Sequence, residues 1–411
     1  MDALRITCAG LDVHQKTVVA CILTGPIEGK PKTLIQTFGT TTKELLQLQD
    51  WLAENNCTEA AMESTGVLWK PVWNVLESTC KLVLANPQHI KNLPGRKTDV
   101  KDAQWIAQLH RCGLIEPSMV ATREIRELRD KTRYRRKLVQ QSTSEKNRVH
   151  KILQDANIKL TTYMSDLFGV SGRALLEKLI DGEVLEEDTV RDLVKNQLKK
   201  KVNLLMDALN GKLLYHHREM IKYHMEHLKF LEDQIGRLEE NIQVLVKPYQ
   251  EEVKLLDSIP GIDEIAATTL MAEISPNAAN YFSSDAKLAS WVGVCPGNNE
   301  SAGVKKTAKS RKGNNQAKGI LCQAAWANSV HQNRIGEYFR RIRKRRGEQK
   351  AAVATAHLLL RIAYALLKNR VEYAHLEQSF FQIPTEKMTE RLTKQLQQLG
   401  YQVELKLTGT Q

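Results

Sequence analysis

Apolar and polar positions along the first part of the chain, up to about residue 115, follow strand and helix spacings in turn. Short apolar runs that end at polar turns predict strands at 6–13, 17–23, 33–38, 60–63 and 81–85. Helical spacing of apolar residues predicts helices at 41–55, 69–79 and 99–112. Three strands followed by alternating helices and strands indicate an α/β domain with a mixed sheet.

The middle of the chain is helical, and its first helix, 123–155, is basic. Between 123 and 151 there are eleven Lys or Arg against four Asp or Glu. A second helix repeats apolar residues every seven positions from Leu214, with a companion set three positions later that starts at His217. Such a seam predicts pairing with another helix, either 123–155 of the same chain or a helix of a second subunit. His217 and His224 lie in this seam. They are interpreted as packing residues rather than metal ligands, because no cysteine or carboxylate accompanies them at ligand spacing.

A third helical unit extends from about 252 to 375 and opens with a turn at Pro260-Gly261 between two helical segments. This pattern is similar to a helix-hairpin-helix, whose turn offers backbone N–H groups to a DNA phosphate, so Gly261 is a candidate DNA contact. An ordinary helical hairpin is the alternative. The polar stretch after 376 is expected to be a mobile tail. The expected domains are therefore 1–118 (α/β), 119–250 (helical, coiled coil), 251–375 (mainly helical) and 376–411 (tail).

Charge narrows the choice of partner. The chain has 60 Lys and Arg against 47 Asp and Glu, a formal net charge of +13, which favours nucleic acid over a neutral partner. A solvated basic surface is the alternative. No apolar run reaches the roughly 20 residues of a membrane helix, and the N-terminal residues lack a signal-peptide pattern. A cytoplasmic protein without membrane contact is expected. Its seven cysteines form no CxxC pair and are expected to be free thiols.

Four acidic residues stand where predicted strands end or where a predicted helix begins. They are Asp12, Glu63, Asp99 and Asp102. If the two strands are adjacent, all four carboxylates converge at one end of the sheet, where oxygen ligands of this kind hold Mg²⁺ or Mn²⁺ and support phosphodiester chemistry. The alternatives are a turn residue for Asp12 and a helix cap for Asp99.

The order of these acids resembles that of a RuvC-like, RNase H-fold nuclease with a DEDD set. The amino-acid sequences of three stretches are more specific than the order of the acids: MESTG at 62–66, PGRKTDVKDA at 94–103 and REIRELR at 123–129. Together they are similar to the DEDD transposases of bacterial insertion sequences, the family described as bridge-RNA-guided recombinases. The resemblance implies an RNase H-like N-terminal domain with a metal bound by the four carboxylates. It also implies donor and target double-stranded DNA, a guide RNA encoded by the element, and a dimer or tetramer that is nucleoid-associated when active.

The resemblance further implies a C-terminal serine that attacks DNA, in a composite site that unites the DEDD and serine domains of the assembled oligomer. The matching segment is CPGNNESAGVKK at 295–306, in which Ser301 is the matching serine and Ser310 the nearest alternative. From the residues alone, 301–318 has six Lys or Arg and no acid, which suits a phosphate site. A flexible basic loop with Ser301 as a turn residue is the other interpretation.

The candidate nucleic-acid contacts come from the basic helix, the Pro-Gly turn and the serine loop. They are Arg133, Tyr134, Arg135, Arg136, Lys137, Gly261, Lys305, Lys306, Lys309, Arg311 and Lys312. A further basic cluster lies at 340–346. The sequence thus predicts a transposase with a phosphoserine intermediate. The alternatives are a stand-alone metal-dependent junction nuclease, for which Ser301 is dispensable, and a non-catalytic nucleic-acid-binding protein.

Overall fold

The computed structural model describes residues 2–87, 90, 102–296, 299–301, 304–307, 310, 312–376 and 385–405; for 299–301, 304–307, 385–388 and 391 it describes the backbone alone. The chain divides into two compact units, Met1–Ala121 and Thr122–Gln411.

The first unit is built on a five-stranded sheet with the order β3-β2-β1-β4-β5. Its strands are β1 (Thr7–Val13), β2 (Thr17–Thr24), β3 (Lys32–Gly39), β4 (Glu59–Glu63) and β5 (Lys81–Ala85). β1, β2 and β3 pair antiparallel, whereas β4 and β5 continue the sheet parallel to β1. The predicted mixed α/β sheet is confirmed, and its order and pairing are those of an RNase H-like domain.

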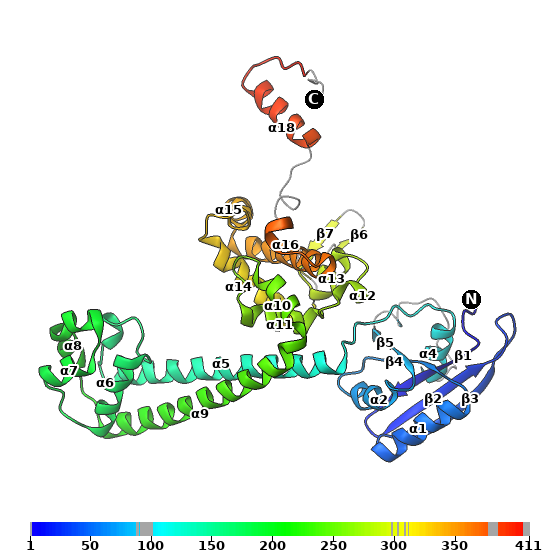
Figure 1. The fold of residues 1–411 in the computed structure, drawn as a ribbon, viewed down its shortest axis with the longest axis horizontal. Helices are drawn as coiled ribbons and strands as arrows, with labels where there is room; N and C mark the ends of the chain where they lie inside the picture. Colours follow the sequence, from blue (N-terminus) through cyan, green and yellow to red (C-terminus); the bar gives the residue numbers. More distant parts are fainter. Residues whose placement is uncertain are drawn as a thin grey trace. The chain divides into compact units, whose positions relative to one another are not determined.

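Helices cover both faces of this sheet (Figure 1). On one face, α1 (Thr42–Glu54) and α2 (Trp69–Leu76) pack through Leu48 and Leu76 against Leu11 and Met62. On the other face, α4 (Asp102–Arg111) packs against Ala61 and Cys21. All seven cysteines of the chain are free thiols, as expected from the sequence, and burial raises the pKa of Cys8 to about 12.

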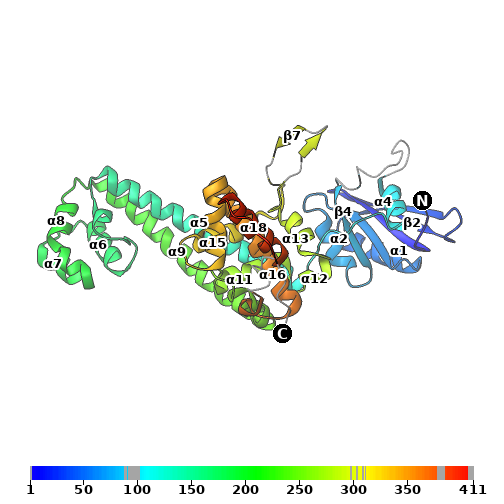
Figure 2. The ribbon, with the colours of Figure 1, turned by 90° about the horizontal axis from the view of Figure 1, so that it is seen from above.

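Two long helices form the stem of the second unit. α5 (Arg123–Asp155) and α9 (Tyr215–Val246) lie side by side in both views of the ribbon (Figures 1 and 2). The seam residues Ile221, Leu228 and Ile242 of α9 are buried. The predicted helix pairing therefore takes place within the chain, and the seam is no longer an argument for a second subunit.

A small helical cluster joins the two stem helices, and its Leu175, Leu176 and Leu205 share one apolar core with Val149 of α5 and Ile221 of α9. Its elements are η1 (Leu160–Thr162), α6 (Val170–Asp181), α7 (Glu187–Leu193), η2 (Asn196–Lys201) and α8 (Val202–Leu209). Figure 2 shows α6, α7 and α8 at one end of the stem.

The helices that follow the stem in the sequence precede α16 (Glu348–Asn369), whose apolar side chains are largely buried. They are η3 (Lys247–Tyr249), α10 (Gln250–Asp257), α11 (Glu264–Ile274), α12 (Ala278–Tyr281), α13 (Asp285–Val292), α14 (Asn315–Ser329) and α15 (Arg334–Arg346). A hairpin of β6 (Asn299–Ser301) and β7 (Val304–Thr307) lies between α13 and α14 in the sequence. α16 has the length and apolar composition of a membrane-spanning helix, but 67% of its apolar window is buried, as in the core helix of a soluble protein.

Part of the polar stretch after 376 is helical. Residues Thr385–Gln398 form a helix, α18. Leu392 and Leu396 stand one helical turn apart within it, a spacing that was not recognised among the surrounding polar residues. The weak pattern of this segment did not predict the helix, and its role as a mobile polar tail stays a prediction.

Candidate active site

Asp12 and Glu63 lie on neighbouring strands at the same edge of the sheet. Leu11 of β1 is aligned with Met62 of β4, and these strands run parallel, so Asp12 is aligned with Glu63 at their carboxyl ends. Side chains alternate between the two faces of a sheet. Because Leu11 and Met62 enter the core beneath α1 and α2, Asp12 and Glu63 belong to the opposite face, the one covered by α4.

Asp102 reaches this edge because α4 runs antiparallel to β1. At the C-terminal end of α4, the carbonyl oxygen of Arg111 accepts a 2.8 Å hydrogen bond from the backbone N–H of Leu4, which precedes β1. Further along, Ala103 lies directly over Gly10. Asp102, in the first turn of α4, is therefore carried beyond Gly10 towards Asp12. Asp99, the fourth predicted carboxylate, lies outside the described residues.

Gly10 makes this close approach possible. A Cβ atom at residue 10 would lie 2.2 Å from the carbonyl oxygen of Ala103 and 2.3 Å from the backbone nitrogen of Ala107. We expect Gly10→Ala to push α4 off the sheet and to lower the free energy of unfolding by about 1–3 kcal/mol, the cost of overpacking. Thermal or urea unfolding of the full chain measures the change.

Gly236→Ala is the matched control for this prediction. No atom lies within 4 Å of a Cβ built at Gly236, which is inside helix α9. Alanine there is expected to stabilise the chain by up to about 1 kcal/mol, because it is the better helix former. Equal stability of the two variants would contradict the close packing of α4 on β1.

The charges at this edge fit a cation. Three carboxylates lie toward it, and carboxylate oxygens are the ligands that divalent cations take in proteins. Within the described residues, no three of these carboxylate oxygens come within 4.8 Å of one another. His14, which was not singled out from the sequence, lies 3.0 Å from Asp12, measured from Nε2 to Oδ2. Its place in the turn directly after β1 was the one available signal.

The predicted nucleophile lies on the β6–β7 hairpin. Ser301 is the last residue of β6 and is aligned with Val304 of β7, and Lys305 and Lys306 follow on that strand. Lys309 and Arg311 lie outside the described residues, and Lys312 is exposed. At the base of the hairpin, Pro296 and Ser310 form an antiparallel bridge.

Lys318 fastens this base to the helices. Its ammonium donates to Ser310 Oγ at 2.6 Å and to the carbonyl oxygen of Gly293 at 3.2 Å. Lys318 belongs to α14, and Gly293 is the C-cap of α13. Since one cation holds the chain before and after the hairpin, the two ends of the hairpin are fixed relative to each other. Ser310, the alternative nucleophile, is thus engaged by a donor rather than by a base.

A buried carboxylate connects the stem with the start of α14. Glu273 is fully buried, and Arg133 of α5 donates to both of its oxygens, at 2.6 and 2.7 Å. Asn314, the N-cap of α14, donates to Glu273 Oε2 at 2.6 Å. Arg129 binds the backbone carbonyl groups of Ala272 and Glu273. The hydrogen bonds to Glu273 raise the pKa of Arg133, whereas burial lowers the pKa of Arg129.

Removing this carboxylate is expected to be costly. Glu273→Ala leaves a partly buried guanidinium and an amide without their acceptor, and should lower the free energy of unfolding by about 3–5 kcal/mol. Glu239→Ala is the control, because Glu239 pairs with Arg135 at a site where the glutamate side chain is 42% exposed. It should cost less than about 1 kcal/mol. Comparable losses in chemical unfolding would argue against the buried network.

The basic helix uses much of its charge internally. Arg133 binds Glu273, Arg135 binds Glu239, and Arg136 donates to Gln316 Oε1 of α14 at 2.7 Å. Tyr134, 53% exposed, and Lys137, also exposed, are the members of this predicted patch that face solvent. Nucleic-acid binding by this predicted patch stays a prediction. It is best supported for Tyr134 and Lys137, because these side chains face solvent.

The Pro-Gly turn lies between α10 and α11, as predicted. Gly261 has a φ of 82°, which favours glycine, and a Cβ there would lie 2.5 Å from Asn328 Nδ2 of α14. The N-cap of α11 is Asp263, whose carboxylate accepts from the backbone N–H of Ala266 at 2.8 Å. That carboxylate competes with a phosphate for the helix N-terminus. DNA binding at Gly261 stays a prediction, and the negative charge of Asp263 would oppose it.

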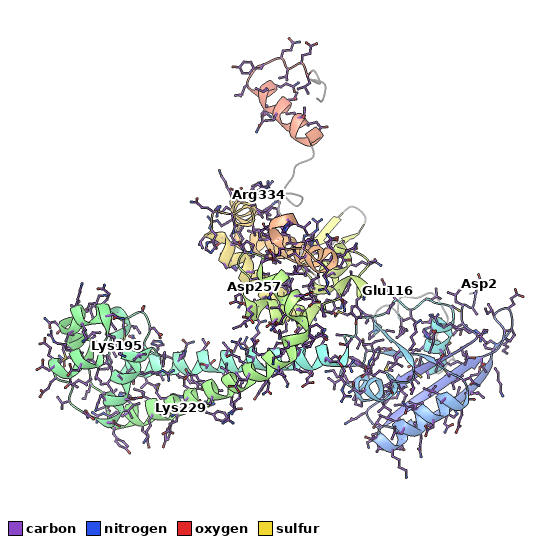
Figure 3. The ribbon with its side chains drawn as sticks, viewed as in Figure 1. Asp2, Glu116, Lys195, Lys229, Asp257 and Arg334 are labelled. Carbon is purple, nitrogen blue, oxygen red and sulfur yellow. The ribbon has the colours of Figure 1, made fainter. Side chains whose placement is uncertain are left out.

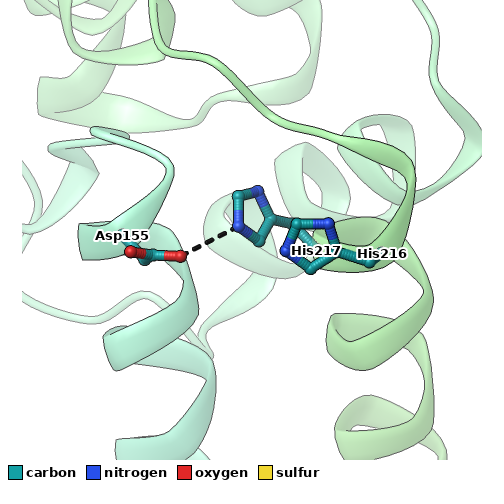
Figure 4. Close-up of side chains that lie close together, drawn as sticks. All are labelled: Asp155, His216 and His217. Atoms are coloured by element: carbon teal, nitrogen blue, oxygen red, sulfur yellow. Dashed lines mark hydrogen bonds and ion pairs between the residues drawn. The ribbon is translucent and has the colours of Figure 1, made fainter.

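Carboxylates do accompany the seam histidines, contrary to the reason given from the sequence. His217 Nε2 lies 3.0 Å from Asp155 Oδ2 (Figure 4). With His216 these residues form a group whose possible ligand atoms lie within 4.8 Å. However, the backbone N–H of Leu214 donates to His217 Nδ1, so Nε2 carries the proton of the neutral ring and donates it to Asp155. A metal at Nε2 would disrupt that arrangement.

A second histidine pair lies further along the stem. Glu145 of α5 is buried and lies 2.7 Å from His224 Nδ1 and 3.3 Å from His227 Nδ1 of α9. The sequence did not reveal these contacts because the partners are separated by about 80 residues and meet only when the stem forms. Pairing with the stem acids accounts for the place of the histidines in the seam.

Comparison with known proteins agrees with both units. Residues 9–158 match a family model described as transposase, that of the DEDD transposases of IS110 elements. Residues 253–340 match a model described as the transposase IS116/IS110/IS902 family. Among curated proteins, none matches the chain. The two matched ranges include Asp12, Glu63, Asp102 and Ser301. The chain therefore belongs to the IS110 family of transposases, enzymes that cut and rejoin DNA strands.

Proposed function

We propose that this transposase cuts DNA through Ser301, which forms a covalent phosphoserine link to the broken strand. In this proposal Asp12, Glu63, Asp99 and Asp102 hold the divalent metal that a DEDD domain implies, as Mg²⁺ or Mn²⁺. The observation that carries the proposal is the approach of three of these acids to one edge of the sheet, two on adjacent strands and one in the first turn of α4. Carboxylate oxygens are the ligands such cations take.

The chemistry assigned to each group is an ordinary displacement at phosphorus. The metal would stabilise negative charge on the attacked phosphodiester. Ser301 Oγ forms a bond to phosphorus, loses its proton, and displaces a deoxyribose oxygen, which takes up a proton. Because the phosphoserine link replaces one phosphodiester by another, a DNA hydroxyl can reverse the step, release the serine and rejoin the strand. No external energy source is needed.

The segments are assigned separate tasks. We assign metal binding to residues 1–118 and strand transfer to residues 251–375. The stem and its helical cluster, 119–250, connect these two segments in the sequence, and 376–411 is an appended tail. The partners are double-stranded donor and target DNA and a guide RNA encoded by the flanks of the element, in the bacterial cytoplasm. Support comes from the net charge of +13 and from the exposed Tyr134, which can stack on an unpaired base.

Assembly into a dimer or tetramer is proposed through the outer side of α9. Apolar side chains that do not face α5 are exposed there: Met220, Tyr223, Phe230 and Val244 are each more than 40% exposed. Exposed apolar residues that recur along one helix are typical of a helix–helix interface. This stripe replaces the heptad seam as the argument for an oligomer.

The guide RNA is tested by purifying the transposase from cells that carry its gene with the native flanking DNA. A single RNA species transcribed from those flanks is expected to copurify. Treatment with ribonuclease should stop strand exchange in vitro, and the synthetic RNA should restore it, because base pairing would carry the choice of sequence. Strand exchange that persists after ribonuclease treatment would overturn the RNA requirement but leave the serine chemistry standing.

A further inference from the structure

A groove of about 970 Å³ lies between α15 and α16, at the base of the hairpin that carries Ser301. Tyr338, Ile342 and Arg346, one helical turn apart, form its α15 side, and Lys350, Val353 and Ala354 are part of its α16 side. Pro296 and Ser310, which pair at the base of the hairpin, close one end. Figure 3 labels Arg334, the first residue of α15, and so locates this helix.

The lining of this groove combines apolar and cationic side chains. Val294, Ile342, Val353 and Ala354 supply an apolar floor, whereas Arg346 and Lys350 are exposed cations. None of the described residues that line the groove is acidic. The two grooves along α5 differ in this respect, because one includes three glutamates and the other Asp263.

This combination matches one nucleotide rather than a duplex. A nucleobase has an apolar face and a polar edge, and its phosphate is anionic, so an aromatic ring beside cations is a typical site for an unstacked base. In a duplex the base faces are stacked and cannot reach an apolar floor. Arg343, Lys344 and Arg345 extend the positive charge at the C-terminus of α15, where the helix dipole favours cations but leaves them available to an anion.

Lys318 gives the groove a fixed relation to the hairpin. It holds Ser310, which lines the groove, and Gly293, which precedes the hairpin, at hydrogen-bonding distance. A strand that occupies the groove therefore lies against the base of the hairpin that bears Ser301. This holds for any phosphodiester that Ser301 attacks.

We propose that this groove binds an unpaired nucleotide of the DNA strand next to the bond that Ser301 breaks. The base stacks on the face of Tyr338 opposite the one that the Arg341 guanidinium covers, above the apolar floor, and its phosphate binds Arg346 and Lys350. The assignment of the strand to DNA rests on the proposed function of Ser301, whereas the capacity of the groove to hold a base does not.

The test measures binding by the full-length chain carrying Ser301→Ala, so that no strand is cut. The probes are a fluorescent single-stranded thymine oligonucleotide and the same oligonucleotide with abasic sugars, which keeps the phosphates but lacks the bases. We expect the base-bearing strand to bind roughly tenfold more tightly. Ala354→Trp fills the groove and should abolish this preference. Ala286→Trp, at an exposed site on α13 outside the groove, should leave it unchanged.

Two more variants and a control separate the effect of stacking from those of charge and misfolding. Tyr338→Ala should reduce the preference for the base-bearing strand over the abasic strand. Its thermal unfolding, followed by circular dichroism, should match that of the parent. Arg346→Gln with Lys350→Gln should weaken both strands and lower the slope of log K against log salt by about 1.4, the value for two phosphate contacts. Arg343→Gln with Lys344→Gln, an equal change of charge outside the groove, should change the slope less.

The outcomes separate this inference from the proposed function. A parent that binds abasic and base-bearing strands equally, or a preference that survives both Ala354→Trp and Tyr338→Ala, would overturn the groove. If a uridine oligoribonucleotide of the same length binds through the same residues more tightly than the thymine oligonucleotide, the assignment of the strand to DNA is overturned. Loss of preference in the groove variants, together with no covalent adduct from the unmutated chain, would retain the nucleotide site and reject only the serine chemistry.

Discussion

Replacing Ser301 with alanine is expected to lower the formation of the rejoined junction by at least about 1,000-fold, because a nucleophile has no substitute in its own reaction. The assay keeps the gene with its native flanking DNA in bacterial cells and detects the circular junction by PCR. Equal expression of the variant and the unmutated protein is checked in the same cells. A stand-alone nuclease that uses water would instead leave Ser301→Ala nearly as active as the parent.

Two other serines calibrate this result. Ser290 is exposed on α13, outside the hairpin and the groove, and Ser290→Ala is expected to recombine like the parent. Ser310→Ala removes the acceptor of the Lys318 hydrogen bond at the base of the hairpin and should lower recombination without abolishing it. If Ser310→Ala abolishes the junction while Ser301→Ala retains it, the two serines have been assigned in the wrong order.

The second large effect is expected from the acidic edge of the sheet. Three variants each remove one negative charge at nearly constant shape: Asp12→Asn, Glu63→Gln and Asp102→Asn. Each should lower DNA cleavage by about 1,000-fold or more, because a metal that loses an anionic ligand no longer stabilises the transition state. Removing divalent metal with a chelator should lower DNA cleavage by the unmutated protein to a similar extent, and adding Mg²⁺ or Mn²⁺ should restore the cleavage. Cleavage of labelled DNA is the measurement.

Asp50→Asn provides the matched control, because Asp50 is an exposed acid on α1 of the same unit. It is expected to cleave like the parent. Calorimetric titration of the full chain with Mn²⁺ should show binding that Asp12→Asn weakens and Asp50→Asn does not. If the unmutated protein binds nucleic acid but does not cleave it in Mg²⁺ or Mn²⁺, or if the three acid variants cleave like the parent, the catalytic role of the edge is rejected.

The sheet of the first unit was predictable because its strands are short apolar runs with clear ends, and the placement of Asp12 and Glu63 follows from those ends. The position of Asp102 was less accessible. It depends on α4 running antiparallel to β1 at a distance that only the glycine at residue 10 permits, and the sequence does not say which helix that glycine meets. The fourth acid, Asp99, remains a prediction from spacing and resemblance.

Contacts between distant segments were beyond the sequence patterns. The heptad of α9 predicted a partner helix but not which one, because a seam is compatible with any helix that presents a similar face. Glu273 reads as an ordinary helix residue in MAEIS, yet it binds Arg133, which lies 140 positions earlier. For this reason Arg133 and Arg135 were assigned to nucleic acid on charge alone, although both pair with acids inside the second unit.

The most direct test of the serine mechanism is to capture the covalent intermediate. The purified transposase, with the proposed guide RNA and Mg²⁺, would be incubated with DNA that is nicked beside the cleavage site, so that rejoining is blocked. The mixture would then be denatured and digested. Mass spectrometry is expected to find a nucleotide attached through phosphate to Ser301, and no such peptide from Ser301→Ala. Cleaved DNA without any protein adduct, or an adduct on Ser310, would contradict the mechanism.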